Sequence, residues 1–267
     1  MSTPFFRFQR FTVWHDRSSM RVGTDGVLLG ALCPINTDKG DASPLSILDI
    51  GTGSGLVALM LAQRTESVPA RIDAIDIDPA SVEQASENFA ASPWSDRLKA
   101  ICCAVQDYHP DTRYDIIVSN PPFFENALKA PDAVRSAARH TDTLPFAELF
   151  AAAQRLLADN GQFTLILPAS ATDQLPTSAT DQLPNSPTLQ LTERTDIFSK
   201  PGKPLRRVLL TYTLPPTPFR HPVPSFSGSA ASYILLPTTF FIEGTAPDGT
   251  PLPRSEQYQL ATRDFYL

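Results

Sequence analysis

The most chemically informative stretch of the chain is the run Asp49-Ile50-Gly51-Thr52-Gly53-Ser54-Gly55, which follows an apolar segment and precedes one with helical spacing. Glycines at such a junction permit a tight turn and let a ligand approach the backbone closely. The spacing is G-x-G-x-G, whereas dinucleotide-binding loops have G-x-G-x-x-G. The acid in front of the glycines suits a cationic amino group better than a pyrophosphate. We therefore expect a ligand site here; the alternative is a purely structural turn.

Two further carboxylates follow later segments with strand character. Asp76 lies 21 residues after Gly55, where a carboxylate can accept hydrogen bonds from the vicinal hydroxyls of a ribose. Asp78 stands directly before Pro79, which indicates a helix cap. Asp107 follows the third strand, where a carboxylate either reaches the exocyclic amine of an adenine or occupies a turn. Because ligands bind outside the carboxyl ends of parallel strands, this arrangement predicts a nucleoside site.

The tetrad Asn120-Pro121-Pro122-Phe123 follows the fourth predicted strand and has a definite chemistry. A planar amino group conjugated to a ring or a carbonyl is a poor nucleophile, because its lone pair is delocalised. The Asn120 side-chain oxygen and the Pro121 carbonyl can each accept one N–H, which stabilises positive charge as it develops on the nitrogen. Phe123 can stack on the planar group. No strong base is needed, so the electrophile must be highly activated, as a sulfonium methyl is; two prolines that merely end a strand are the alternative.

The elements that must position these residues alternate between strand and helix from residue 46 onward. We predict strands at Ser46–Ile50, Ile72–Ile77, Leu98–Val105, Tyr114–Ser119, Phe163–Leu167 and Arg207–Thr213. We predict helices at Gly55–Arg64, Ala80–Ala91 and Pro145–Ala158, the last one ended by Gly161. The alternation predicts an α/β fold with a mostly parallel sheet and helices on both faces.

Two regions interrupt this alternation. Ser170–Pro176 is repeated as Ser178–Pro184, and its prolines oppose a continuous helix, so we expect a mobile surface loop over about residues 170–187. Pro215–Pro224 and Gly244–Pro253 are rich in proline and glycine and indicate surface connections. We divide the chain into an N-terminal segment (1–45), a catalytic domain (46–214) and a C-terminal extension of the same domain (215–267). The apolar, aromatic end TRDFYL is expected to dock on the domain.

Composition excludes several classes of protein. The 267 residues are 42% hydrophobic and 19% charged, which is typical of a globular protein rather than a disordered one. The chain has no apolar run long enough to span a membrane and begins without the apolar stretch of a signal peptide. Three cysteines and four scattered histidines predict neither a disulfide framework nor a zinc site. We expect a cytoplasmic protein without a structural metal.

Basic residues gather in two places although the formal net charge is −6. One cluster lies in the first thirty residues and the other in residues 191–207. Each is either a solvated face or a contact to nucleic acid. The aromatic residues of the N-terminal cluster either stack on bases or belong to the core; they are Phe5, Phe6, Phe8 and Phe11.

Taken together, these motifs resemble those of the class I S-adenosylmethionine-dependent methyltransferases that carry N-P-P-(Y/F). The chain is similar over nearly its whole length to one family of this class, the bacterial tRNA(Val) adenine-37 N6-methyltransferases. The similarity rests on Phe8–Leu32, the Asp49–Gly55 loop, the Asn120–Phe123 tetrad, Ser199–Leu210 and the terminal TRDFYL. It implies a Rossmann-like, mostly parallel sheet of seven strands and methyl transfer from S-adenosylmethionine to an adenine N6 in tRNA. The tandem repeat and Gly244–Pro253 depart from the family pattern.

The resemblance also implies a role for each matching residue. Asp49, Gly51, Gly53 and Gly55 would surround the methionine part of the cofactor, Asp76 its ribose and Asp107 its adenine amine. Thr24 would lie near the methionine carboxylate, or would cap a helix. Asn120, Pro121 and Phe123 would form the target-amine site. The residues implied as contacts to RNA phosphates are Lys200, Lys203, Arg206, Arg207, Arg7 and Arg10.

Three alternatives use the same motifs. A protein-glutamine N5-methyltransferase would activate an amide with the same tetrad, but such enzymes typically carry a separate N-terminal helical domain, and here only 45 residues precede the first of these strands. A guanine N2-methyltransferase of rRNA would also use a planar amine. A protein that binds the cofactor without catalysis would not require the Asn120–Phe123 tetrad. An anticodon-loop adenine suits the site because a single-stranded base is cheaply extruded.

Overall fold

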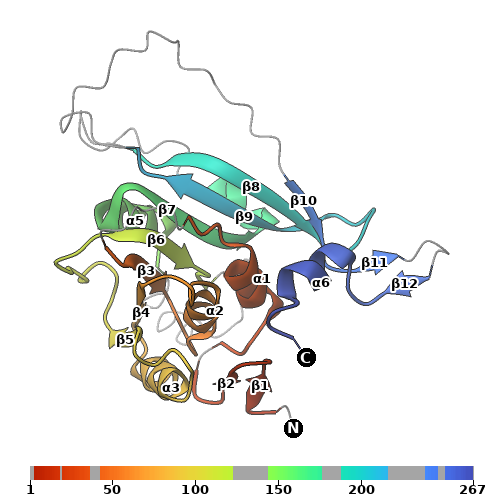
Figure 1. Ribbon diagram of the computed structural model, residues 1–267. Coiled ribbons are helices and arrows are strands. Elements are labelled where there is room, and N and C mark those ends of the chain that lie inside the picture. The colour runs from red at the N-terminus through yellow and green to blue at the C-terminus, as the bar shows by residue number, and fades with distance from the viewer. Residues whose placement is uncertain are drawn as a thin grey trace, which may run out of the picture.

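One eight-stranded sheet organises the part of the chain that the computed structural model describes, residues 3–18, 20–36, 43–122, 144–175, 188–215, 238–245 and 250–266. Its strands are β3 (Leu45–Ile50), β4 (Ala70–Asp76), β5 (Leu98–Cys102), β6 (Tyr114–Ser119), β7 (Leu157–Pro168), β8 (Gln190–Phe198), β9 (Leu205–Thr213) and β10 (Thr238–Phe241). They lie in the order β10-β8-β9-β7-β6-β3-β4-β5 (Figure 1). This order places β6 directly beside β3.

The sheet is mostly parallel, as predicted. Strands β3 to β7 all pair in parallel, β9 runs antiparallel to both β7 and β8, and β10 is parallel to β8. The parallel pairs are connected through α2 (Leu56–Arg64), α3 (Pro79–Ala90) and α5 (Phe146–Leu156). The expected number of seven strands was too low. The short edge strand β10 adds an eighth, and β8 was missed because most of its side chains are polar and only Ile197 is buried.

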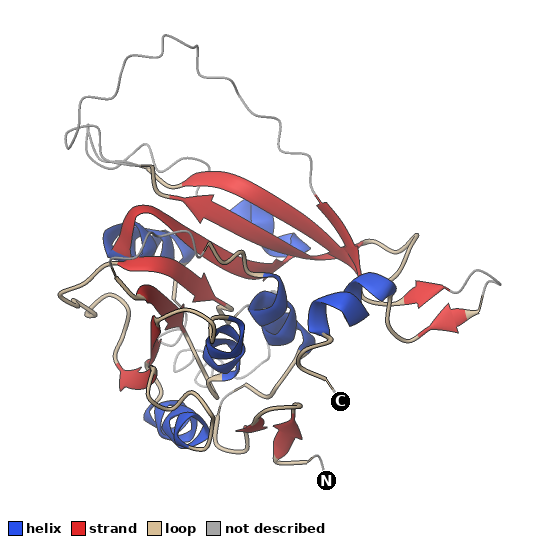
Figure 2. Ribbon diagram, in the orientation of Figure 1, coloured by secondary structure: helices blue, strands red, loops and turns tan. Residues whose placement is uncertain are grey.

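Helices cover both faces of the sheet, which confirms the predicted layering (Figure 2). Successive side chains of a strand point to opposite faces. In β3, Ile47 joins the apolar cluster that contains α1 (Thr24–Leu32) and α2, whereas Leu48 joins the cluster that contains α5. Each central strand therefore contributes to two separate cores. None of the described helices is long and apolar enough to cross a membrane.

Two predicted boundaries were wrong. Strand β5 ends at Cys102 rather than Val105, so the chain leaves the sheet earlier and forms a turn. Helix α5 ends at Leu156, and Gly161 lies inside β7 rather than at a helix end. A Cβ at Gly161 would lie 2.8–2.9 Å from neighbouring backbone oxygens, so this glycine is required by a close approach of two strands. Asn160 takes the left-handed conformation there, with φ 62°.

The two ends of the chain lie against the domain. The N-terminal strands β1 (Phe5–Arg7) and β2 (Thr12–Trp14) form a hairpin, and α6 (Glu256–Thr262) follows a second small hairpin of β11 (Gly244–Thr245) and β12 (Pro251–Leu252). Phe265 is only 2% exposed, and its carbonyl accepts the Gln9 N–H at 2.8 Å. The expected docking of the C-terminal segment is confirmed.

The N-terminal aromatic residues divide between core and surface. Phe8 and Phe11 are buried, and their rings stack with centroids 4.6 Å apart, which supports their interpretation as core residues. Phe6 is exposed. The first copy of the tandem repeat begins in a 3₁₀ helix over Ala169–Gln174, and residues 176–187 lie outside the described residues.

Replacement of Phe265 by alanine should destabilise the whole domain. Truncation of a buried phenylalanine loses the free energy of burying its ring and leaves a cavity. We therefore expect a loss of about 3–5 kcal/mol in the free energy of unfolding. Chemical denaturation measures this loss. Leu260→Ala is the matched control, because Leu260 lies in the adjacent helix α6 but is 63% exposed and should change stability by less than about 0.5 kcal/mol. Equal effects of the two substitutions would contradict the docking of the C-terminal segment.

Candidate active site

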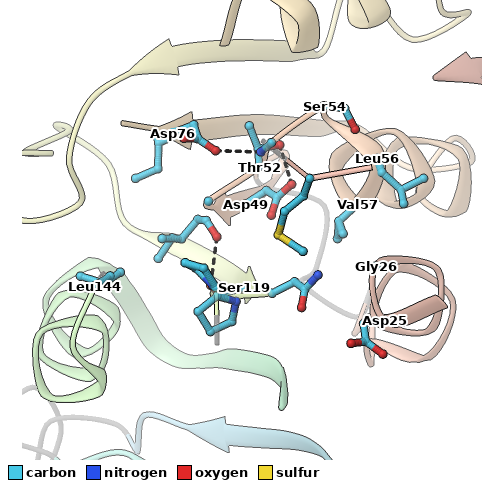
Figure 3. A pocket seen from close by; sticks show the side chains of 18 of the residues that line it. Asp25, Gly26, Asp49, Thr52, Ser54, Leu56, Val57, Asp76, Ser119 and Leu144 are labelled. Carbon is cyan, nitrogen blue, oxygen red and sulfur yellow. Dashed lines mark hydrogen bonds between the residues drawn. The ribbon is translucent and has the colours of Figure 1, made fainter. Parts of the chain in front are cut away.

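A cavity of about 660 Å³ lies at the carboxyl ends of β3, β4 and β6 (Figure 3). Its wall combines the glycine loop, the first turn of α1 and the turns that follow β4, β5 and β6. Seven of the predicted catalytic and cofactor-binding residues line it: Thr24, Asp49, Gly51, Gly53, Asp76, Asn120 and Pro121. Ligands of open parallel sheets bind at this edge. The structure therefore brings most of the predicted site together.

The glycine loop needs its glycines for two different reasons. Gly51, Gly53 and Gly55 all have positive φ angles, between 55° and 83°. A Cβ at Gly51 would meet no protein atom within 4 Å and would project into open space. A Cβ at Gly55 would lie 2.5 Å from the Phe89 ring, so Gly55 serves helix packing and does not line the cavity. The loop is thus open where a ligand would approach and tightly packed behind.

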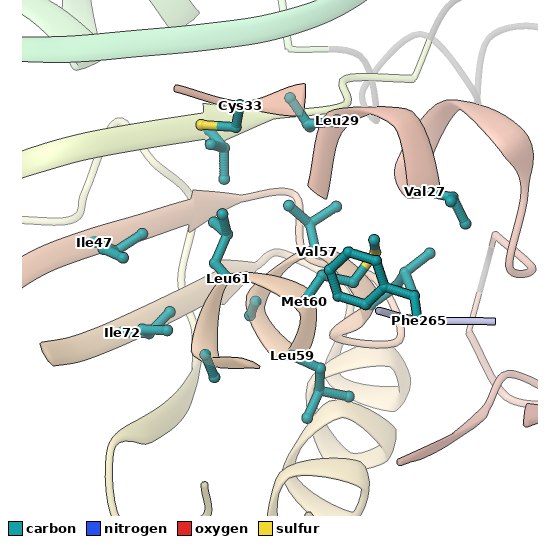
Figure 4. Packing of buried hydrophobic residues seen from close by; sticks show 14 of the residues in the cluster. Val27, Leu29, Cys33, Ile47, Val57, Leu59, Met60, Leu61, Ile72 and Phe265 are labelled. Carbon is teal, nitrogen blue, oxygen red and sulfur yellow. The ribbon is translucent and has the colours of Figure 1, made fainter. Parts of the chain in front are cut away.

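Helix α2 follows the glycine loop directly and holds its end in place. Every residue from Leu56 to Gln63 is buried, so this helix contacts protein on all sides. Val57, Leu59, Met60 and Leu61 pack among the strands and α1, together with Phe265 from the C-terminal end (Figure 4). A helix held this firmly leaves the loop in front of it little freedom to move.

Asp49 is a buried acid at the floor of the cavity. It is 1% exposed, and its Oδ2 accepts a hydrogen bond of 2.7 Å from the Thr52 hydroxyl. Burial raises the pKa of this carboxyl to about 7, and the hydrogen bonds from Thr52 and Ala58 only partly oppose the shift. Among the described residues no lysine or arginine pairs with it. The site therefore favours a positive group.

Asp76 links the loop to the second strand. Its Oδ2 accepts the Gly53 N–H at 2.8 Å, and its Oδ1 accepts the Asp78 N–H at 3.0 Å. Each oxygen retains a lone pair that can face the cavity. Asp78 caps α3 by accepting the N–H of Ser81 at 3.1 Å, and the Ser81 hydroxyl, which donates to the same carboxylate at 2.7 Å, lowers the pKa of Asp78. The predicted cap is confirmed.

Asn120 stands where β6 leaves the sheet. The preceding residue, Ser119, pairs with Ile50 in β3, and its hydroxyl donates to the Ile50 carbonyl at 2.9 Å. Asn120 is half-buried and Pro121 is buried, and both line the cavity. Phe123 lies outside the described residues. The pairing of β6 with β3 therefore places Asn120 next to the glycine loop.

The turn after β5 departs from the prediction. Asp107 is exposed and does not line the cavity, whereas Gln106 and Cys103 do. Strand β5 ends early, at Cys102, and residues 103–106 of the following turn line the cavity, whereas Asp107 does not. No sequence signal distinguished Gln106 from its acidic neighbour.

The segment before α1 contributes residues that sequence reasoning missed. Thr24 lines the cavity, but Gly23 occupies the N-cap position and Thr24 is the first residue of the helix, so the capping interpretation was wrong. Met20 and Arg21 also line the cavity. Gln84 holds this segment on α3, since its side-chain oxygen accepts the Ser18 N–H at 2.9 Å. The sequence around Ser18 does not predict that this segment contacts α3.

A second cavity, of about 820 Å³, adjoins the first. The two share Asn120 and Pro121, and the second extends toward the 3₁₀ helix and the loop before β9. Of the predicted RNA contacts, Arg206 and Arg207 line both cavities, and Lys203 lines the second. Lys200 and Arg7 are exposed and line neither.

Arg10 is engaged elsewhere. Its Nη1 lies 2.7 Å from both carboxylate oxygens of Glu66, and its guanidinium lies 5.1 Å from the centroid of the Trp94 ring. The ion pair lowers the pKa of Glu66. These contacts hold the N-terminal hairpin on the domain, so a structural role accounts for Arg10 without RNA.

The residues of the first cavity fit S-adenosylmethionine. A buried carboxylate without a cation, Asp49, suits the amino group of its methionine part. The Asp76 carboxylate suits two ribose hydroxyls, and the space in front of Gly51 lets a ligand lie against the backbone. All three features lie on one wall.

The buried Asp49 should make stability depend on pH. In the unfolded chain its carboxyl has an ordinary pKa near 3.9, so from about pH 4 to pH 7 the folded protein keeps a proton that the unfolded chain has lost. Its contribution to stability therefore falls as pH rises through this range. We expect Asp49→Asn to be more stable than the wild type at about pH 8 and nearly equal to it near pH 4. Denaturant unfolding at both pH values measures the difference; an equal difference at both would contradict the burial of a titrating group.

Comparison with known proteins agrees with this geometry. Residues 37–178 match the family model of the methyltransferase small domain. A tRNA1(Val) (adenine(37)-N6)-methyltransferase of Bacteroides fragilis is 45% identical over 216 residues, which cover 80% of this chain and 85% of that protein. One from Aeromonas salmonicida is 46% identical over 205 residues, covering 77% and 81%.

A solved structure shows the same fold. That of a predicted O-methyltransferase from Agrobacterium tumefaciens superimposes with a TM-score of 0.56 and 17% identity, covering 90% of this chain and 96% of that one. The expected class I, Rossmann-like fold is confirmed. With 45% identity to curated relatives across most of both sequences, the chain belongs to the S-adenosylmethionine-dependent tRNA1(Val) (adenine(37)-N6)-methyltransferase family.

Proposed function

We propose that this protein transfers the methyl group of S-adenosylmethionine to the exocyclic N6 amine of adenine 37 in a valine tRNA, in the cytoplasm. The observation that carries the proposal is the position of the Asn120 amide, one residue beyond the β3–β6 pairing and on the wall of the cofactor cavity. The names of the relatives supply the substrate: those proteins act on adenine 37 of tRNA1(Val).

In this proposal the cofactor lies across the glycine loop. Asp49 and the backbone at Gly51 and Gly53 hold its methionine part, with Thr24 at the carboxylate, while Asp76 binds the ribose. At the adenine end we assign the 103–107 turn, where Gln106 lines the cavity and Asp107 is exposed. When bound, S-adenosylmethionine supplies a methyl group on a positively charged sulfur. Gly55 supports the loop through its contact with Phe89.

The chain's own contribution to the reaction is to prepare a weak nucleophile. The Asn120 side-chain oxygen and the Pro121 carbonyl each accept one N–H of the target amine, which localises the nitrogen lone pair and stabilises the charge that develops on it. Among the described residues the cavity wall contains no histidine, and none is required, because the newly methylated nitrogen carries a positive charge and readily loses a proton to water. We assign stacking on the target base to Phe123, from the tetrad alone.

The reaction and its substrate are tested together with purified protein and methyl-labelled S-adenosylmethionine. Unmodified total tRNA, unmodified rRNA and a release factor are offered in parallel, and the products are analysed by nucleoside and peptide mass spectrometry. We expect label in N6-methyladenosine of tRNA. Label in methylguanosine of rRNA, or on a glutamine of the release factor, would keep the Asn120 chemistry and reject the proposed substrate.

Loss of the Asn120 amide should separate catalysis from cofactor binding. We expect Asn120→Ala to keep the Kd for S-adenosylmethionine within about threefold and to lower turnover by roughly 10² or more, as for loss of one charge-stabilising contact. Calorimetry gives the Kd and single-turnover assays give the rate. Equal loss of binding and turnover would make Asn120 a structural residue.

Asp76→Ala should show the opposite pattern. Without this carboxylate the two ribose hydroxyls lose a charged acceptor, so the Kd for S-adenosylmethionine should rise by roughly tenfold or more. Turnover at saturating cofactor should fall much less. Asp107→Ala is a useful comparison, because Asp107 is exposed and does not line the cavity. An unchanged Kd in Asp76→Ala would remove Asp76 from the ribose site.

A further inference from the structure

We propose that Arg155 of α5 is a positioning residue for cofactor binding: it fixes the adenine end of the cavity, so that adenine is accepted and a base with the opposite hydrogen-bonding edge is rejected. The segment that it holds is residues 103–109, the β5 turn, which follows β5 and includes Gln106. This inference rests on the proposed function, because it takes the adenine of S-adenosylmethionine to lie at the β5 turn. Arg155 itself does not line the cavity.

Arg155 binds the β5 turn through backbone atoms of the turn. Its Nη2 donates to the Val105 carbonyl at 2.8 Å, and its Nη1 donates to the Tyr108 carbonyl at 2.7 Å. Nη1 also lies 3.2 Å from Nδ1 of His109. Because a guanidinium is planar and rigid, two of its nitrogens on two carbonyls fix both the separation and the direction of those carbonyls. The Arg155 side chain is half-buried, which strengthens these bonds relative to bonds in water.

The bond to Val105 sets the orientation of a peptide group on the cavity wall. In a trans peptide the carbonyl oxygen and the following N–H point in opposite directions, so this bond turns the Gln106 N–H away from α5. Val105 and Gln106 both line the cavity. The hydrogen-bonding groups that this wall offers to a base therefore depend on a side chain of α5.

Further hydrogen bonds attach the β5 turn to its surroundings. The Gln106 Nε2 donates to Glu148 in the first turn of α5 at 2.6 Å. The hydroxyls of Tyr108 and Tyr114 lie 2.6 Å apart, and Tyr114 donates to Asp73 of β4 at 2.6 Å. The β5 turn is therefore bonded both to the sheet and to α5.

Helix α5 is packed on the sheet by other side chains. Its buried residues belong to one apolar cluster and are Leu149, Phe150, Ala152, Ala153 and Leu156. The contacts of Arg155 go instead to residues 105–109. These bonds therefore position the β5 turn rather than attach the helix.

The assignment is tested with two cofactor analogues that differ only in the base, S-adenosylhomocysteine and S-inosylhomocysteine. Hypoxanthine has an oxygen where adenine has its amine and an N–H where adenine has the acceptor N1, so peptide groups held in place distinguish the two bases. For the wild type we expect a Kd for the inosyl compound at least about tenfold above the Kd for the adenosyl compound, measured by calorimetry. In Arg155→Ala this ratio should fall to about threefold or less, because the turn no longer holds its peptide groups in one orientation.

The ratio of the two Kd values separates positioning from stability, because a smaller folded fraction weakens the binding of both compounds equally. A lysine at this position reaches one carbonyl but not both, so Arg155→Lys should give an intermediate ratio, and it decides the question if Arg155→Ala does not fold. Turnover at saturating S-adenosylmethionine should stay within about threefold of the wild type, whereas KM for the cofactor should rise.

Arg97→Ala is the matched control. The Arg97 Nη1 also donates to two backbone carbonyls, those of Thr65 and Val68, but neither of these residues lines the cavity. This variant should keep the wild-type ratio of Kd values.

Failure of the inference is distinguishable from failure of the proposed function. A wild type that binds both compounds equally would reject the proposed placement of adenine at the β5 turn, and the inference with it. A wild type that discriminates, together with a folded Arg155→Ala or Arg155→Lys that keeps the full ratio, would reject the positioning role of Arg155 alone.

Discussion

The pairing of β3 with β6 is the constraint on which the rest of the site depends. Ile50 and Ser119 are paired neighbours, and one residue later the two strands leave the sheet as Gly51 and Asn120. The loop that meets the cofactor and the amide that meets the target amine are therefore placed by the same ladder. Because side chains alternate along a strand, a slip of one residue would turn Asn120 toward the other face. The Ser119 hydroxyl, bonded to the Ile50 carbonyl, reinforces this register.

Parts of this arrangement lower the stability of the folded protein. Asp49 is buried without a cationic partner in the described residues, and its carboxyl is held in a place that disfavours its charge. Gly51 and Gly53 take left-handed conformations on the open side of the loop, whereas Gly55 makes room for the Phe89 ring. The tightly buried helix α2 and the docked C-terminal segment supply the stability that such a loop lacks. The glycine loop therefore provides the open binding surface, and α2 with the C-terminal segment provides the packed core next to it.

The central α/β unit could be predicted from sequence because its signals are local. The Asp49–Gly55 run, the cap at Asp78 and the strand before Asn120 each follow from residue type and spacing, and all three lie where they were expected. What could not be predicted depends on contacts between distant segments. Met20 lines the cavity in a segment that Gln84 anchors to α3, and Gln106 rather than Asp107 lies on the wall beyond the end of β5. Likewise the ion pair between Arg207 and Asp25 joins residues 182 positions apart.

The central claim is that one amine, N6 of adenine 37, is methylated at the Asn120 site. The most direct test measures methyl transfer from labelled S-adenosylmethionine to two unmodified tRNA(Val) transcripts that differ only at nucleotide 37, adenine in one and guanine in the other. The account predicts label in the adenine transcript, recovered as N6-methyladenosine, and none in the guanine transcript. Equal label in both would place the reaction at another nucleotide and would contradict the claim.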